Sequence, residues 1–221
     1  MSNVTRRKFL GAAAGSAVVA ALEPSSIFAA KGKAHLLPQP STANNESLMS
    51  ALKNRKSTRS FSSKPLPRQM LSNLLWAAFG INRPEFGYRT APSPMNSQEI
   101  EIYLAKSNGL FLYDAYFHQL IQISTEDIRS FCGSQEFVAK APLNLIYVAN
   151  FSRLGKRDDE KKLFYAAADT GFISQNVYLF CAAFGLGTVV RDWIDRPVLA
   201  PKTQLREDQR IILAQTVGYP G

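Results

Sequence analysis

Residues 160–184 read EKKLFYAAADTGFISQNVYLFCAAF, and this stretch decides the fold because it predicts the longest helix of the chain. Its second half is almost entirely apolar, which is typical of a helix that is buried on most sides. A helix of this kind lies in the centre of a structure or in an interface between subunits. Gly185 and Gly187 follow directly and end the helix.

The segments around this helix form strands and helices in an irregular order. Leu143 to Ala149, LNLIYVA, predicts a buried strand introduced by Pro142. Residues 81–98 are rich in Pro, Gly, Arg and Asn and predict a loop. Further strands are predicted at 99–105 (half-buried), 110–116, 121–123, 188–190 and 211–217, and helices at 47–54, 68–79 and 125–131. Since helices and strands do not alternate strictly, the predicted class is α+β.

The first 30 residues predict a signal peptide for export. Arg6 and Arg7 are followed by Lys-Phe-Leu and an apolar stretch from Ala12 to Leu22, which is typical of a twin-arginine signal peptide. An ordinary secretory signal with two adjacent arginines is the alternative. The apolar stretch is too short to span a bilayer comfortably, so no stable membrane anchor is expected after cleavage near Ala29 or Ala30.

Export by the twin-arginine machinery bears on function, because this route carries folded proteins whose cofactor is inserted before export. The mature protein is then periplasmic or otherwise exported. Residues 31–46 predict a linker or an extended arm, and residues 47–221 predict one domain. Removing residues 1–30 changes the formal charge of +9 to 23 − 16 = +7, since Arg6, Arg7, Lys8 and Glu23 leave with them.

Composition argues against several functional classes. The chain has two histidines and two cysteines, Cys132 and Cys181, which is too few for a typical zinc site. Cys181 lies in an apolar run and is expected to be a buried, inert thiol, although one bridge is possible in an exported protein. Nothing near His118 resembles a nucleophile motif, and no P-loop is present. The basic charge comes without a nucleic-acid-binding motif, so a nucleic-acid partner is not expected.

Three short motifs could carry chemistry. Arg55-Lys-Ser-Thr-Arg59 gathers three cations and two hydroxyls directly after a helix, and Arg and Ser side chains suit phosphate. By itself this motif also fits a solvated basic turn. Asn96 and Gln98, in a loop stiffened by Pro92 and Pro94, offer donors and acceptors that suit the polar edge of a flavin. By itself this motif also fits a plain surface loop. Gly185-Leu-Gly187 is weaker, because a helix end explains it without any ligand.

Together these motifs resemble the FMN-dependent nitroreductase family. The pattern consists of Arg55-x-Ser57-x-Arg59-x-Phe61, Ala91-Pro92-Ser93-x-x-Asn96-x-Gln98 and Gly185-Leu186-Gly187-Thr188, in the family's order. The likeness runs from about Leu48 to Pro220 and looks closest to the branch of the SagB-type azoline dehydrogenases. It implies a nitroreductase-like fold, with a central, mostly antiparallel sheet flanked by helices and an interlocked homodimer that binds one FMN at each of two interface sites.

The resemblance also implies roles for individual residues. Arg55, Lys56 and Ser57 would hold the phosphate and ribityl side of FMN, and Arg59 would lie beside the ring, where a cation stabilises the reduced flavin. Pro92, Ser93, Asn96 and Gln98 form the loop that would approach the ring from the partner subunit. The residues after Gly187 would pass over the ring, namely Val190, Arg191, Asp192 and Trp193.

Two departures from the family pattern stand out. Many relatives have Gly at or near Trp193, so the substrate face is expected to be narrower or lined by an aromatic side chain. Many also continue past the last strand with basic residues that hold the phosphate, whereas this sequence stops at Gly221. Arg191 and Arg89 are the candidates to replace that clamp.

The implied activity is ping-pong hydride transfer at flavin N5, with no side chain acting as a nucleophile. The donor is a reduced nicotinamide, NAD(P)H, or another reductant, and the acceptor is a small electrophile such as a nitroaromatic or a quinone. Two alternatives remain open at this point. One is a flavin-binding sensor or carrier without turnover, and the other is an exported ligand-binding domain that has lost FMN.

Overall fold

The strand at the centre of the structure is β7, Leu143–Asn150, whose eight residues are all buried. In the computed structural model, which describes residues 32–42 and 46–221, its side chains alternate between two hydrophobic cores. Leu145 and Tyr147 belong to one core, and Ile146 and Val148 belong to the other. A strand covered on both faces reads as a continuous apolar run, which is why the sequence identified it. The signal-peptide prediction for residues 1–30 lies outside the described residues.

Seven strands form one sheet in the order β1-β6-β5-β4-β7-β9-β8, and every neighbouring pair is antiparallel. The other strands are β1 Ala34–Leu36, β4 Ile100–Lys106, β5 Gly109–Asp114, β6 Gln119–Ser124, β8 Gly187–Arg191 and β9 Gln209–Gly218. The predicted α+β class with an antiparallel central sheet is confirmed. The dimer stays a prediction, because one chain is described.

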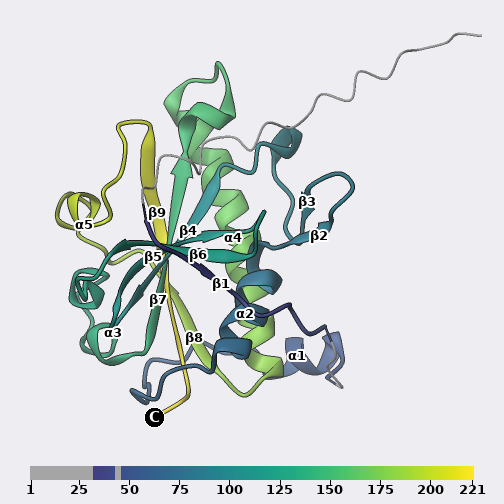
Figure 1. The fold of residues 1–221 in the computed structure, drawn as a ribbon, viewed down its shortest axis with the longest axis vertical. Coiled ribbons are helices and arrows are strands. Elements are labelled where there is room, and N and C mark those ends of the chain that lie inside the picture. The colour runs from purple at the N-terminus through teal and green to yellow at the C-terminus, as the bar shows by residue number, and fades with distance from the viewer. Residues whose placement is uncertain (1–31, 43–45) are drawn as a thin grey trace, which may run out of the picture.

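Helices cover both faces of the sheet (Figure 1). One layer contains α1 Leu48–Asn54, α2 Arg68–Phe79 and α4 Asp159–Ala183, and the other contains α3 Glu136–Lys140 and α5 Arg196–Lys202. Short 3-10 turns complete the chain at Pro94–Asn96 (η2), Arg129–Phe131 (η3) and Phe151–Leu154 (η4). Among the described residues, no helix is long and apolar enough to cross a membrane.

Helix α4 has 25 residues and is about 37 Å long at 1.5 Å per residue. The Asp158 side chain caps its first turn by accepting a hydrogen bond from Lys161 N at 2.7 Å. Gly185, at φ +68°, follows its last turn in the left-handed region that favours glycine. One side of α4 packs against the sheet, while Phe164 and Phe172 are exposed on the described chain.

Five details differ from the sequence predictions. The predicted loop 81–98 contains a two-stranded hairpin, β2 Ile81–Arg83 with β3 Tyr88–Arg89. Strand β4 is buried on both faces rather than half-buried, because helices cover both sides of the sheet. The predicted helix at 125–131 is only the turn η3, and the short helices α3 and α5 went unpredicted. Residues 34–36, in the segment expected to be a linker or arm, add β1 to the edge of the sheet.

The two cysteines are free and lie in different hydrophobic cores. Cys181 belongs to the core under α4, and Cys132 belongs to the opposite core. Burial raises the pKa of the Cys132 thiol to about 12 and that of Cys181 well above its ordinary value. Both thiols are therefore neutral and unreactive at physiological pH, as expected for Cys181 from its apolar neighbours.

Candidate functional site

Strand β8 lies at the edge of the sheet, and the basic segment Arg55–Arg59 lies against that edge. β8 pairs with β9 on one side only. On its open side, Thr188 O accepts a hydrogen bond from Thr58 N at 2.9 Å. Val190 N donates to the hydroxyl of Tyr178 at 3.0 Å. An edge strand needs partners for its free backbone groups, and here the basic segment and α4 supply them.

Gly187 allows the basic segment to approach β8 closely. A Cβ atom at this position would lie 2.8 Å from Thr58 Cγ2 and 2.9 Å from Thr58 Cβ, which is closer than carbon atoms pack. The two glycines of Gly185-Leu-Gly187 therefore have different structural roles. Gly185 ends α4 with a positive φ, and Gly187 lets two backbone segments meet.

Tyr178 joins three parts of this region, a role that was not predicted from the sequence. Its hydroxyl lies 3.0 Å from Ser57 Oγ as well as 3.0 Å from Val190 N. Its ring lies under the guanidinium of Arg55, whose Cζ is 5.4 Å from the ring centroid. The available signal was a single tyrosine on an otherwise apolar helix segment, because a buried tyrosine usually needs a partner for its hydroxyl.

This arrangement presents cations at one edge of the molecule. Lys56, Ser57 and Arg59 are exposed, and Arg55 is half-buried over Tyr178. Because Val190 N–H occupies one lone pair of the Tyr178 hydroxyl, that hydroxyl can donate its proton to Ser57 Oγ. Ser57 can then donate its own proton outward. The segment thus offers one hydroxyl and three positive charges, a donor set that suits a phosphate ester.

The second motif, residues 90–98, is held in a strained conformation. Met95, Asn96 and Gln98 have φ values of +54°, +56° and +48°, in the left-handed region that costs non-glycine residues energy. Hydrogen bonds maintain the turn: Gln98 N donates to Ser93 Oγ at 2.9 Å, and Asn96 N donates to Ser93 O at 3.1 Å. Pro92 and Asn96 remain exposed at its surface.

The Gln98 amide was expected to contact the flavin, but its hydrogen-bonding groups are used within its own loop. Its Oε1 accepts from Arg89 Nε at 2.8 Å, and its Nε2 donates to Gly87 O at 2.8 Å and to Asn96 Oδ1 at 2.9 Å. Both ends of the amide are therefore used to hold the hairpin and the loop together. Gln98 organises the loop rather than offering its amide to a ligand.

The structure does not bring the two motifs together within one chain. Tyr178, in the last turns of α4, holds the basic segment, whereas Arg157, just before α4, donates to Met95 Sδ at 3.3 Å in the loop. Arg153 NH1 also donates to Gln98 O at 2.7 Å. In Figure 1 the loop, between β3 and β4, and α1, which leads into the basic segment, lie toward opposite ends of α4.

The Arg191 side chain was expected to hold a ligand, but it is used for hydrogen bonds inside the protein. Its guanidinium donates to Cys132 O at 2.7 Å, to Asn144 Oδ1 at 3.0 Å and to Thr216 Oγ1 at 3.1 Å. Burial lowers the pKa of Arg191 to about 10, so the side chain stays charged in the interior. It therefore links β7, β8 and β9 and cannot replace a phosphate clamp at the surface.

Arg89, the other candidate clamp, is also used internally. Its guanidinium stacks on Phe79, with Cζ 4.4 Å from the ring centroid, and donates to Phe79 O at 3.2 Å. Burial lowers the pKa of Arg89 to about 10.

Beyond β8, Asp192 is exposed and pairs with Arg196, and Trp193 is 72% exposed. Trp193 is thus the aromatic group nearest in sequence to the edge strand.

The nitroreductase family profile matches residues 52–219, which span both motifs and β8. The chain belongs to the nitroreductase family. Two of the similar proteins that carry the name “putative nitroreductase” cover most of their own length with this match. One, from Methanocaldococcus jannaschii, is 32% identical over 145 residues, covering 61% of this chain and 73% of the relative. The other is a crystal structure from Ralstonia eutropha JMP134 with 44% identity and a TM-score of 0.81, covering 85% of this chain and 90% of that one.

The fold also resembles the NADPH:FMN oxidoreductase of Vibrio harveyi complexed with NAD⁺. That structure has 18% identity and a TM-score of 0.59, and the match covers 78% of this chain and 68% of that one. At this identity the likeness concerns the fold alone. At the cationic edge beside β8, the donors of Arg55, Lys56 and Ser57 fit a phosphate ester.

A pair of buried carboxyl groups lies behind the strained loop of this nitroreductase-family chain. Glu99, at the end of the loop, is fully buried, and Asp169 on α4 is 3% exposed. Glu99 Oε1 and Asp169 Oδ2 have no donor among the described residues. Burial, followed by the hydrogen bond and the negative charge of Glu99, raises the pKa of Asp169 to about 8. At neutral pH this raised pKa keeps Asp169 protonated, and its hydroxyl can act as the missing donor to Glu99.

His118 has a serine neighbour that the sequence did not reveal. Ser72 Oγ lies 2.7 Å from His118 Nε2, and Tyr113 OH lies 3.0 Å from His118 Nδ1. Ser72 is completely buried, and its hydroxyl also donates to Pro38 O at 2.5 Å. The cluster therefore ties the segment after β1 to α2, and no substrate can reach the serine.

We expect Tyr178→Phe to lower the free energy of unfolding by about 1–3 kcal/mol, because the variant leaves Val190 N–H and Ser57 without their shared partner. Urea denaturation measures this change. Tyr116→Phe is the matched control, since Tyr116 is exposed and its hydroxyl has no hydrogen-bond partner among the described residues. Equal stability of the two variants would contradict the bridging role of Tyr178.

The buried acid pair should make stability depend on pH. The pKa of Asp169 is raised from 3.8 to about 8 in the folded chain, so between about pH 4 and pH 8 the folded state keeps a proton that the unfolded state has lost. Stability should therefore fall as the pH rises through this window, by at most about 1.4 kcal/mol per pH unit from this pair.

Urea denaturation across that pH range checks this expectation. Asp169→Asn and Glu99→Gln should each flatten the dependence, because neither variant can ionise both members of the pair. Glu85→Gln, at an exposed position, should keep the wild-type dependence. If both pair variants keep the wild-type slope, the pair does not hold the proton.

Proposed function

We propose that this chain is an FMN-dependent oxidoreductase that passes hydride from a reduced donor such as NAD(P)H to a small electrophilic acceptor. Membership of the nitroreductase family supports an oxidoreductase in general. The observation that carries the assignment of FMN is the cationic segment fixed to the edge of β8 by Thr58 and Tyr178. We further propose that the chain belongs to the SagB-type branch, on the order and spacing of its motifs.

In this proposal Arg55, Lys56 and Ser57 hold the phosphate and ribityl side of FMN. These side chains are at least partly exposed and carry donors, and the backbone between them is fixed by the hydrogen bond from Thr58 N to Thr188 O. A pre-positioned donor set loses less conformational entropy when it binds an anion. The stacking of Arg55 on Tyr178 limits the freedom of its side chain further.

Bound FMN would supply an electron-accepting ring that exchanges hydride with one small molecule at a time. Arg59 would place a positive charge beside the ring and so favour its anionic reduced form. Val190 N–H is already bonded to Tyr178, so it is not available as a donor to the ring. Trp193, being exposed just beyond β8, would limit the acceptor to small or flat molecules.

A homodimer would unite the two motifs that lie apart in one chain. Exposed apolar side chains on α1 and α4 support such an interface, namely Leu48, Met49, Leu52, Leu163, Phe164 and Phe172. Patches of this kind mark protein interfaces, because water contact with them is unfavourable. Pro92, Ser93 and Asn96 of a second chain would then face the ring held by the first chain.

Residues 1–30 add the proposal that the protein is exported with its cofactor already bound. NAD(P)H is scarce outside the cytoplasm, so the physiological donor there would be another reductant or a redox partner protein. The acceptor class stays broad, covering nitroaromatics, quinones and similar electrophiles.

We expect the purified protein to be yellow, and we expect Arg55→Met to weaken FMN binding by roughly tenfold to a hundredfold. A charge-assisted hydrogen bond to phosphate contributes about 1.5–3 kcal/mol, which gives this range. Fluorescence titration of the apoprotein with FMN measures the affinity. Arg210→Met is the control, because Arg210 is exposed on β9 at Phe151 and away from the basic segment.

Anaerobic addition of NADH or NADPH should then bleach the flavin absorption. A protein that takes up no FMN would overturn the proposal. A yellow protein that no donor reduces would instead favour a flavin-binding sensor or carrier.

We expect the double variant Phe164→Lys/Phe172→Lys to be monomeric and to lose FMN affinity, because two buried charges would oppose association. Light scattering coupled to size-exclusion chromatography measures the mass. Val198→Lys on α5, another exposed apolar position, should leave both the mass and the affinity unchanged. A wild-type protein that runs as a monomer with full FMN affinity would contradict the shared site.

A further inference from the structure

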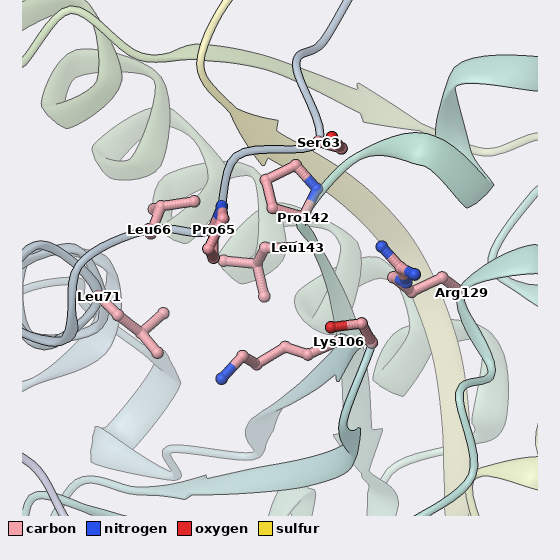
Figure 2. A pocket seen from close by; sticks show the side chains of 9 residues that line it. Ser63, Pro65, Leu66, Leu71, Lys106, Arg129, Pro142 and Leu143 are labelled. Atoms are coloured by element: carbon pink, nitrogen blue, oxygen red, sulfur yellow. The ribbon is translucent and has the colours of Figure 1, made fainter.

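A cavity of about 300 Å³ lies beside the end of β4 and the start of β7 (Figure 2). It opens between the segment before α2, the end of β4, the turn η3 and the start of β7. Strand β9 lies between β7, which lines the cavity, and the edge strand β8. Its lining consists of Ser63, Pro65, Leu66, Leu71, Lys106, Ser107, Arg129, Pro142 and Leu143.

The walls of the cavity are mainly apolar and continuous with the protein core. Leu71 and Leu143 are buried members of the core under α2 and α4. Pro65, Leu66 and Pro142 close the sides. Small-molecule sites in proteins have this composition, with an apolar lining and a few polar groups that fix the orientation of the ligand.

Lys106 is the polar group that faces this apolar space. It is the last residue of β4 and is half-buried, and Figure 2 shows its ammonium directed into the cavity toward Leu71. Among the described residues, no carboxylate lies within ion-pair distance of Lys106 Nζ, and its closest ring contact is Phe111 at 5.3 Å. Burial, and then the positive charge of Arg68, lower the pKa of Lys106.

Arg129, the other cation of the lining, is already neutralised. Its guanidinium pairs with Asp127 through several hydrogen bonds, the shortest being 2.7 Å from NH2 to Oδ2, and NH1 donates to Ala141 O at 3.0 Å. The cavity therefore has one uncompensated positive charge, beside two serine hydroxyls and an apolar floor. A partly desolvated cation without a counterion is unfavourable until an anion joins it.

We propose that this cavity binds a small organic monocarboxylate with an apolar body. The carboxylate pairs with the Lys106 ammonium, and the body covers Leu66, Leu71 and Leu143. A single free cation matches a single negative charge. The apolar walls favour such a ligand over an inorganic anion, and the charge favours it over a neutral analogue. This site is independent of the proposed flavin site.

Calorimetric titration of the FMN-loaded full-length protein with cyclohexanecarboxylate tests the proposal. This ring is not planar, so it is poorly suited to stacking on a flavin. We expect one binding event per chain and an affinity that falls as the pH rises and Lys106 loses its proton. Lys106→Met should bind at least about tenfold more weakly, since it loses a charge-assisted hydrogen bond. Lys156→Met, an exposed lysine in the loop before α4, should match the wild type.

Cyclohexanecarboxamide tests the contribution of the negative charge, and inorganic phosphate tests the contribution of the apolar body. Each should bind at least about tenfold more weakly than cyclohexanecarboxylate. The NMR signal of the Lys106 ε-methylene should move on titration of the wild-type protein. Three results would overturn the site: no binding, equal binding by Lys106→Met, or equal affinity for the amide. A ligand that perturbs the flavin spectrum while leaving Lys106 unmoved would place binding at the flavin instead, and would leave the proposed function intact.

Discussion

The free edge of strand β8 is the constraint on which the candidate site depends. A strand at the end of a sheet exposes backbone donors and acceptors that must find partners. In this chain Thr58 N and the Tyr178 hydroxyl satisfy two of them. The chain that follows α1 therefore has to run along β8, and it carries Arg55, Lys56, Ser57 and Arg59 with it. The side chains proposed to bind FMN are thus placed by the need to complete a sheet.

Helix α4 extends this constraint across the molecule. Its buried side packs on the sheet through Ile173 and Val177, and this packing fixes the position of Tyr178 at the edge strand. Its exposed aromatic side chains lie on the same rigid element. Because one helix holds both the basic segment and the apolar surface, association of two chains through α4 would set the distance between the two halves of the proposed flavin site.

The strained loop before β4 depends on polar groups buried behind it. Met95, Asn96 and Gln98 lie close together in this loop and have positive φ values. In an isolated peptide these residues would adopt negative φ values instead. Gln98 fixes the loop through both ends of its amide. Glu99, the next residue, turns inward to Asp169, whose raised pKa reflects burial and this second carboxyl group. The loop is therefore fixed from within the core, while Pro92 and Asn96 stay available at the surface.

The sequence by itself determined the elements with strong periodicity or continuous apolar character. Residues 160–184 and 143–149 identified α4 and β7, because periodicity and apolar character depend only on neighbouring residues. The order of three motifs along the chain indicated the family. Only the tertiary structure decided that Arg191 points inward, that Gln98 closes its own loop and that Tyr178 joins Ser57 to Val190. The inward direction of Arg191 depends on strand register, because a shift of one residue in a strand sends every side chain to the opposite face. The role of Tyr178 depends on Ser57, which is distant in the chain. The role of Gln98 depends on the hairpin that places Arg89 and Gly87 beside it.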